Sequence, residues 1–92
     1  MEDPNKFNVK NFNIVDDFVL EVLFEDGTQN IINFGKLELK GWWEELKDLE
    51  YFNQVKIAKT KYLEWPNGQD FKPEHLYYWS EFEKYYLPKS DK

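Results

Sequence analysis

The 92-residue sequence contains no cysteine and no arginine. The absence of cysteine excludes disulfide bonds and thiolate chemistry. All twelve basic residues are lysines, and the formal net charge is −6. Because arginine commonly reads guanine edges and phosphates, and phosphate neutralisation supplies most non-specific affinity, we do not expect direct binding to nucleic acid. The negative charge would attract a basic partner. It is also what an ordinary solvated surface carries.

Long hydrophobic runs are also missing. No apolar stretch approaches the roughly 20 residues that a membrane-spanning helix requires. Met1 is followed by the acidic and polar residues 2–5, which do not resemble a signal peptide. We therefore expect a cytoplasmic protein that does not bind membranes.

Small apolar residues are scarce, whereas aromatic residues are abundant. Ala58 is the only alanine, and Phe, Tyr and Trp make up 20% of the chain. Each aromatic side chain can bury on the order of 150–250 Å², so a few large side chains can build the core. No repeat, low-complexity tract or Gly/Pro/Ser-rich linker interrupts the sequence. Residues 1–92 are therefore predicted to form a single domain.

Alternating apolar residues predict several short strands. The alternation in the first segment slips in phase near Asn11-Phe12, which fits a β-bulge. The dipeptide Asp26-Gly27 stands between two apolar runs and is a strong hairpin signal, because the turn requires a positive φ that glycine tolerates. The predicted strands are residues 7–15, 18–24, 31–34, 55–57 and 62–65.

Spacings of three and four predict helices in two other places. The apolar residues between 42 and 52 are expected to share one helical face, with Asp48 capping the second of two short helices. The members of this face are Trp42 or Trp43, Leu46, Leu49, and Tyr51 or Phe52. Pro73 suits the first position of a helix that continues to Leu87. The predicted class is therefore α+β: a mostly antiparallel sheet with an Asp-Gly hairpin, short central helices and a C-terminal aromatic helix over 73–87.

The order of these segments resembles a known family. The segment Trp65-Pro66-Asn67-Gly68 follows the Asp-Gly hairpin and a short helical stretch. The matching residues are Leu23-Phe24-Glu25-Asp26-Gly27, Leu46, Phe52, Val55, Trp65-Pro66-Asn67-Gly68, Asp70, Pro73-Glu74 and Leu76-Tyr77. Over roughly residues 12–78 the chain resembles the bacterial domain-of-unknown-function family 2442, and the Trp-Pro-Asn-Gly segment is the most specific part of the likeness.

This resemblance implies a compact α+β fold with short helices on one face, and it carries no established activity. It also implies a link to toxin–antitoxin pairs, because members of the family have been suggested as antitoxins. Other members carry a C-terminal helix-turn-helix domain, which the residues up to Lys92 are not expected to include. The family pattern has Ser or Asp before the proline of the last helix, whereas this chain has Lys72, whose side chain cannot accept from the helix-start amides.

Residues suited to catalysis or metal binding are few. His75 is the only histidine, and neither Ser80, on the same predicted helix, nor Ser90 forms an evident nucleophile–base pair with it. The carboxylates lack the spacing of a metal loop, and no Gly-rich phosphate motif occurs. We therefore expect no catalytic residue, no metal ligand and no cofactor, and the chain is predicted not to be an enzyme.

Two aromatic segments are candidates for contact with a partner. Trp65 and its turn would present an aromatic anchor on a rigid loop, but a Trp at the end of a strand is more often packed, which predicts Trp65 buried and Asn67 exposed. The last helix carries six aromatics that cannot share one face, so partner contact, dimer contact or plain partial exposure is expected there. The candidate partner-binding residues are Trp65, Asn67, Asp70, Tyr77, Tyr78 and Tyr85.

The leading interpretation is a non-enzymatic protein-interaction domain. It would act as the antitoxin-like half of a toxin–antitoxin pair by burying an acidic and aromatic surface against a basic, toxin-like protein. A homodimer is a further partner that this surface would serve. The alternatives are a DNA-associated transcriptional regulator acting with a separate DNA-binding subunit, and a domain that binds a small ligand.

Overall fold

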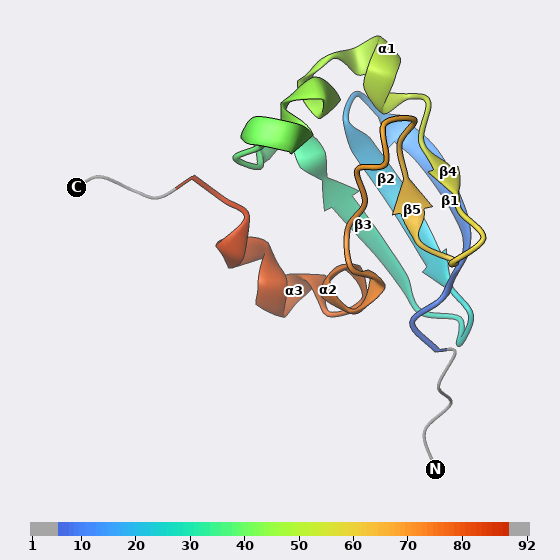
Figure 1. Ribbon diagram of the computed structural model, residues 1–92. Helices are drawn as coiled ribbons and strands as arrows, with labels where there is room; N and C mark the ends of the chain where they lie inside the picture. Colours follow the sequence, from blue (N-terminus) through green and yellow to red (C-terminus); the bar gives the residue numbers. More distant parts are fainter. Residues whose placement is uncertain (1–5, 89–92) are drawn as a thin grey trace.

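The computed structural model describes residues 6–88, so residues 1–5 and 89–92 of the predicted domain lie outside the described part. Three antiparallel strands form one sheet in the order β1–β2–β3, and β4–β5 is a second, two-stranded unit (Figure 1). The elements are β1 (Val9–Asp16), β2 (Val19–Phe24), β3 (Gln29–Asn33), η1 (Phe34–Lys36), η2 (Gly41–Lys47), α1 (Leu49–Phe52), β4 (Lys56–Ile57), β5 (Leu63–Glu64), α2 (Pro73–Tyr77), α3 (Trp79–Phe82) and η3 (Glu83–Tyr85). The α+β class is confirmed.

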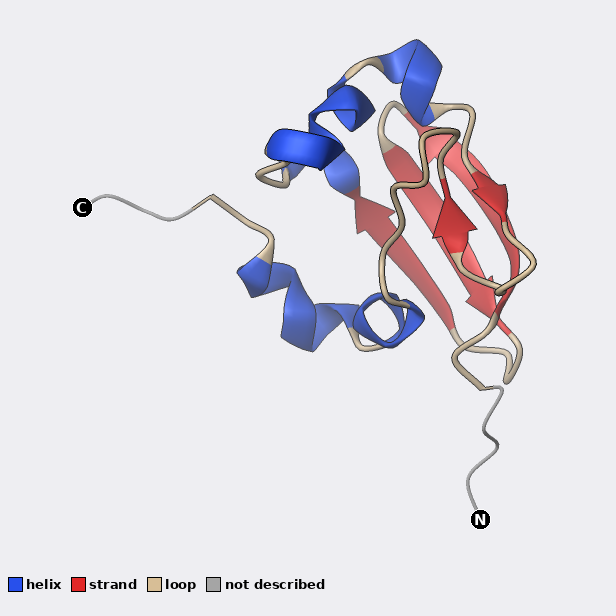
Figure 2. Ribbon diagram, viewed as in Figure 1, coloured by secondary structure: helices blue, strands red, loops and turns tan. Residues whose placement is uncertain are grey.

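The helices gather at two ends of the three-stranded sheet, and the β4–β5 hairpin lies over one face of it (Figure 1 and Figure 2). A backbone hydrogen bond joins the hairpin to the sheet, since Val9 N–H donates to the Lys61 carbonyl at 3.0 Å. The core therefore lies between one sheet face, this hairpin and the two groups of helices.

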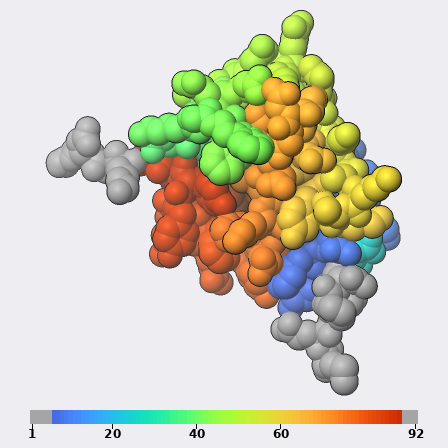
Figure 3. Space-filling view, viewed as in Figure 1, coloured from blue at the N-terminus to red at the C-terminus, as the bar shows by residue number. Residues whose placement is uncertain are grey.

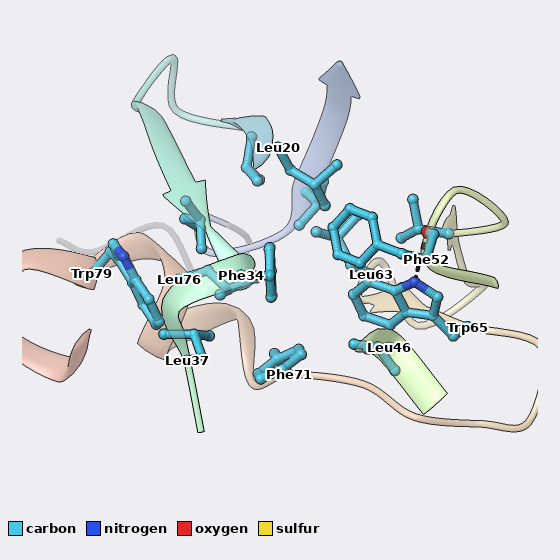
Figure 4. Packing of buried hydrophobic residues seen from close by; sticks show 14 of the residues in the cluster. Leu20, Phe34, Leu37, Leu46, Phe52, Leu63, Trp65, Phe71, Leu76 and Trp79 are labelled. Carbon is cyan, nitrogen blue, oxygen red and sulfur yellow. Dashed lines mark hydrogen bonds between the residues drawn. The ribbon is translucent and has the colours of Figure 1, made fainter. Parts of the chain in front are cut away.

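Strand β2 shows how the sequence directs side chains into that core. Leu20, Val22 and Phe24 are fully buried, whereas the residues between them are only partly buried. This alternation is the period of two that a strand imposes. Large side chains from distant segments pack together with the buried side chains of β2 (Figure 4). The buried cluster consists of Val9, Leu20, Val22, Phe24, Ile32, Phe34, Leu37, Leu39, Leu46, Phe52, Val55, Leu63, Trp65, Phe71, Leu76 and Trp79.

The turn between β2 and β3 is a three-residue loop that ends in a glycine. Phe24 N–H donates to the Thr28 carbonyl at 2.8 Å, and Gly27 N–H donates to the Phe24 carbonyl at 3.0 Å. Gly27 has φ +93°, and Asp26 Oδ1 accepts from Thr28 N–H at 2.9 Å. A glycine of positive φ closing such a loop is a common hairpin solution.

Replacing Gly27 with valine is expected to lower the free energy of unfolding by about 1–2 kcal/mol, because a β-branched residue is strained at positive φ. A Cβ at this position meets no atom within 4 Å, so strain and not a clash would be the cause. Urea denaturation measures the effect. The control is Gly27→Asn, since asparagine tolerates positive φ better; equal midpoints for both variants and the wild type would contradict the prediction.

The first strands differ in detail from the expected boundaries. The register of β1 against β2 shifts between Val9 and Asn11 and again between Ile14 and Asp16, so β1 is irregular at both ends. Phe18 was expected in the second strand, but it lies in the turn before Val19 with φ +62°. The Phe18 ring packs against the core, which holds the residue in a conformation that a bulky side chain rarely adopts.

The prediction of one continuous helix over 73–87 is wrong. Helix α2 begins at Pro73 and ends at Tyr77, and Tyr78 has φ −99° and ψ 43°, outside the helical region. Asn30 of β3 provides the physical reason, because its side-chain amide donates to the carbonyls of Leu76 at 2.8 Å and Tyr77 at 2.7 Å. These carbonyls would otherwise accept from the next helical turn.

Trp42 or Trp43 was predicted to share one helical face with Leu46, and only Trp43 does. η2 is a 3₁₀ helix, in which residues i and i+3 lie on the same side. Trp43 is aligned with the buried Leu46 and is 39% exposed, whereas Trp42 is turned away and is 60% exposed. Asp48 caps α1 as predicted, with its Oδ1 accepting from Glu50 N–H at 3.1 Å.

Within residues 6–88 every helix is too short or too polar to cross a bilayer.

Candidate functional site

Trp65 lies inside the molecule, as predicted. Its side chain is fully buried, and its indole N–H donates to the Phe52 carbonyl at 2.8 Å (dashed line in Figure 4). The ring centroids of Phe34, Phe52 and Phe71 lie 5.9, 5.6 and 5.9 Å from that of Trp65. Because no part of the ring reaches the surface, Trp65 supports the turn that follows it and is not itself a contact for a partner.

The Trp65–Gln69 turn repeats the geometry of the β2–β3 turn. Trp65 N–H donates to the Gln69 carbonyl at 2.9 Å, and Gly68 N–H donates to the Trp65 carbonyl at 2.8 Å. Gly68 has φ +94°. The Trp-Pro-Asn-Gly segment is thus a tight loop, and its glycine provides the positive φ that closes it.

A buried glutamine connects this turn to η2. Gln69 is only 2% exposed. Its side-chain amide donates to the Trp42 carbonyl at 2.9 Å and to Glu45 Oε1 at 2.9 Å. Tyr51 O–H donates to Gln69 Oε1 at 2.6 Å. All the polar atoms of this side chain are therefore satisfied, as buried polar groups require.

Asn67 is exposed, as predicted, and it belongs to the same network. Its backbone N–H donates to the Tyr51 hydroxyl at 2.8 Å, and its side-chain amide donates to Glu45 Oε1 at 2.7 Å. The Asn67 amide, and secondarily that of Gln69, lower the pKa of the Glu45 carboxyl by stabilising its charged form. Asn67 therefore fixes the turn to η2.

Three exposed aromatic side chains form what we call the aromatic ridge: Trp42, Trp43 and Tyr85. They are 60%, 39% and 71% exposed. The segments that carry them adjoin on one face of the molecule, where η2 (green) lies above the C-terminal helices (red) and the orange part of the chain lies beside both (Figure 3).

Two hollows adjoin the ridge. The first has a volume of about 280 Å³ and separates Trp43 from Tyr85; its other lining residues are Glu38, Leu39, Lys40, Phe71 and Tyr86. The second has a volume of about 370 Å³ and is lined by Trp42, Trp43, Gly68 and Asp70. Trp43 lines both hollows.

Two hydrogen bonds to backbone carbonyls connect the segments that carry the ridge. Trp43 Nε1–H donates to the Asp70 carbonyl at 3.3 Å, and Glu38 N–H donates to the Tyr86 carbonyl at 2.7 Å. The second bond joins the two sides of the first hollow. These bonds fix the Trp43 indole to the segment at Asp70, and the segment at Glu38 to the C-terminal helices.

The charges near the ridge are mixed: Lys84 Nζ lies 5.4 Å from the centroid of the Tyr85 ring, and carboxylates lie near the two tryptophans. Lys40 is paired with Glu38 at 3.1 Å. Asp70 lines the second hollow, is exposed and forms no ion pair among residues 6–88. Glu44, also exposed, follows Trp43 directly. A cation approaching the second hollow would meet a carboxylate beside two indole faces.

Tyr77 and Tyr78 lie at another place, beside the end of the β2–β3 hairpin. The Tyr77 hydroxyl donates to Asp26 Oδ2 and accepts from Thr28 Oγ1 at 3.2 Å. This phenol, followed by the Thr28 N–H, lowers the pKa of the Asp26 carboxyl. Tyr78 is 38% exposed and contacts the ring of Phe7, with 5.7 Å between centroids. Neither tyrosine lines the hollows of the ridge.

Of the six candidate residues, the structure thus brings Asp70 and Tyr85 to one surface. Trp42 and Trp43 complete this surface, and sequence reasoning missed them. A signal was present, since adjacent residues on a helix do not face the same side, and two consecutive tryptophans cannot both be buried by one face.

His75 has structural contacts in this molecule. Its Nδ1 lies 2.6 Å from the Tyr86 hydroxyl, and its ring stacks on Phe82 with 4.2 Å between centroids. Burial raises the pKa of Tyr86. Within residues 6–88, no group of three or more His, Cys, Asp or Glu side chains is arranged to hold a metal ion.

A family model described as "Protein of unknown function (DUF2442)" matches residues 9–82, which run from the first residue of β1 to the last of α3. The chain belongs to this family. The DUF2442 region contains the sheet, both glycine-closed turns, Trp42 and Trp43, whereas Tyr85 follows it. No curated protein and no solved structure matches the chain.

Proposed function

We propose that this DUF2442 protein is a protein-interaction domain without enzymatic activity, and that it binds a basic protein through the aromatic ridge. The observation that supports this proposal is the exposure of Trp42, Trp43 and Tyr85 around two hollows. Trp and Tyr are the residues most enriched among those that dominate binding energy at protein interfaces.

The rigidity of the surface supports the same proposal. The carbonyl of Trp42 and the indole of Trp43 are both hydrogen-bonded to the segment that contains Gln69 and Asp70. Little of this chain's backbone therefore has to become ordered when a partner binds. A preorganised surface pays a smaller entropic cost on binding. Large aromatic side chains also have few torsions to immobilise.

Charge favours a basic partner over an acidic one. The chain has a formal net charge of −6, and Asp70 lines the second hollow together with both indoles. A lysine or arginine of the partner would place its charge near this carboxylate and over an aromatic face, where cation–π attraction contributes about 0.5–2 kcal/mol. The resemblance to suggested antitoxins makes a small basic toxin in the cytoplasm the partner that we propose.

A small-ligand function has weaker support. The apolar hollow beside η1 is lined by Phe18, Phe34, Gly35, Leu37, Leu39, Leu46 and Lys47, and its volume is about 150 Å³. Pockets for organic ligands and cofactors commonly measure roughly 300–1,000 Å³, so this apolar hollow is small for such a ligand. Two hollows reach that size, at about 370 and 560 Å³, and both are lined in part by exposed side chains such as Asp70.

Affinity capture from the native host tests the proposal. The wild type is expected to retain a basic protein at moderate salt, and Trp42→Ser combined with Tyr85→Ser is expected to reduce its recovery at least tenfold, about 1.4 kcal/mol. Thermal stability should hardly change, because both side chains are exposed. The matched control combines Ile14→Ser and Val15→Ser, two exposed apolar residues of β1. Equal recovery with the ridge and control variants would refute the role of the ridge.

A further inference from the structure

The chain contains one Asn-Gly pair, Asn67-Gly68, in the turn that follows Trp65. Asn67 is exposed, and Gly68 has φ +94°. An asparagine followed by glycine is the dipeptide most prone to deamidation, because glycine has no side chain to hinder the attack of its backbone nitrogen on the asparagine amide. This turn therefore carries a reactive pair on the surface of the molecule.

The reaction uses atoms of these two residues and water alone. The Gly68 nitrogen forms a bond to Cγ of Asn67, the bond from Cγ to Nδ2 breaks, and Nδ2 leaves as ammonia with the proton that Gly68 gives up. Water then opens the succinimide ring. Attack at Cγ gives aspartate, and attack at the backbone carbonyl carbon gives isoaspartate. An amide and water become a carboxylic acid and ammonia, and nothing is oxidised or reduced.

The folded turn holds the reacting atoms away from this path. Gly68 N–H, which carries the nucleophilic nitrogen, donates to the Trp65 carbonyl at 2.8 Å. The leaving atom, Asn67 Nδ2, donates to Glu45 Oε1 at 2.7 Å. Hydrogen bonds to a carboxylate are among the stronger ones in proteins. Ring closure therefore requires that the turn first open locally, and such openings cost less free energy than global unfolding.

The β2–β3 turn indicates what the product would do. It has the same pair of backbone hydrogen bonds and a glycine of positive φ, and the residue before that glycine is Asp26. An acid at this position is thus compatible with the turn itself. At position 67 it would oppose Glu45, because a carboxylate cannot donate to Oε1 and two like charges at this distance repel each other.

We infer that Asn67-Gly68 is a deamidation site kept closed by Glu45, and that its conversion releases the turn from η2. The change reaches the aromatic ridge. Gly68 lines the second hollow, and a Cβ built on it would lie 3.6 Å from Cζ2 of Trp42. A slow, irreversible reaction of the chain with water thereby alters the surface around Trp42. The inference does not depend on the proposed function, since every measurement below is made on the isolated chain.

Peptide mapping by mass spectrometry tests the role of Glu45. The purified full chain is incubated in mildly alkaline buffer, and the converted fraction of Asn67 is followed over time. Glu45→Ala removes the acceptor of the leaving amide and is expected to raise the rate at least tenfold, which corresponds to about 1.4 kcal/mol of opening free energy. Glu44→Ala is the matched control, because Glu44 is also exposed and makes no hydrogen bond to the turn within residues 6–88.

The wild type and Glu44→Ala should react at equal rates, and both should react much more slowly folded than in concentrated urea. Circular dichroism checks that Glu45→Ala is folded. Equal rates for all three folded proteins would overturn the inference. So would a folded wild type that converts as fast as the chain in urea, because the turn would then give no protection.

A charge exchange between positions 45 and 67 tests the effect of the product. Asn67→Asp is expected to shift the nuclear magnetic resonance signal of the Trp42 indole. Combining it with Glu45→Gln should return the signal toward its wild-type position, because the introduced amide can donate to the introduced carboxylate. Circular dichroism should show the sheet intact in both. An unchanged signal in Asn67→Asp, or a double variant no closer to the wild type than the single one, would refute the release of the turn.

Discussion

Replacing Trp65 with alanine is expected to lower the free energy of unfolding by about 3–5 kcal/mol, the usual cost of deleting a large aromatic side chain from a core. Trp65 is surrounded by Phe34, Phe52 and Phe71, and it is fully buried. The substitution would leave a cavity among these rings. It would also leave the Phe52 carbonyl without the donor that Trp65 provides.

Such a loss is large for a domain of 92 residues, since domains are commonly stable by only about 5–15 kcal/mol. Urea denaturation followed by far-ultraviolet circular dichroism measures it. Trp42→Ala is the matched control, because it removes the same side chain from an exposed position and should change stability by no more than about 0.5 kcal/mol. Comparable midpoints for the two variants would show that Trp65 does not organise the core as described.

Replacing Gln69 with leucine is expected to cost about 2–3 kcal/mol. The volume of the side chain is nearly kept, but the Trp42 carbonyl and the Tyr51 hydroxyl lose a hydrogen-bond partner. A buried polar group left without a partner costs about 1–3 kcal/mol. The effect should reach the aromatic ridge as well, because Gln69 links the turn to the backbone of Trp42.

The measurements for Gln69→Leu are the urea midpoint and the nuclear magnetic resonance line width of the Trp42 indole, which should change if the ridge loosens. Gln54→Leu is the control, since Gln54 is exposed and its amide makes only one long hydrogen bond, to the Glu50 carbonyl at 3.4 Å. Wild-type stability in Gln69→Leu would mean that the network is dispensable.

Much of the fold follows from local signals in the sequence. The apolar run of β2, the glycine at position 27, the proline at position 73 and the cap at Asp48 each act within a few residues, and each was predicted. The break in the last helix at Tyr78 was not predicted. Its cause is Asn30, whose side chain binds carbonyls that are 46 and 47 residues further along the chain. A helical pattern in the sequence contains no trace of such a distant donor.

The candidate site, too, was predicted only in part. The excess of aromatics in the last segment predicted an exposed group there, and Tyr85 is exposed. Trp42 or Trp43 was placed on one helical face with Leu46 because the segment was interpreted with the period of an α-helix, whereas it forms a 3₁₀ helix and both tryptophans are exposed. In a 3₁₀ helix residues three apart eclipse one another, so Trp43 lies on the side of Leu46 and Trp42 does not.

The bond between Tyr77 and Asp26 has a consequence for the order in which the chain folds. The two residues are 51 positions apart, so the contact can form only after a long loop has closed, and contacts between distant residues form slowly. The β1–β2–β3 sheet needs only neighbouring segments. During synthesis its strands leave the ribosome well before Tyr77, and the C-terminal helices must dock last onto a sheet that has already formed.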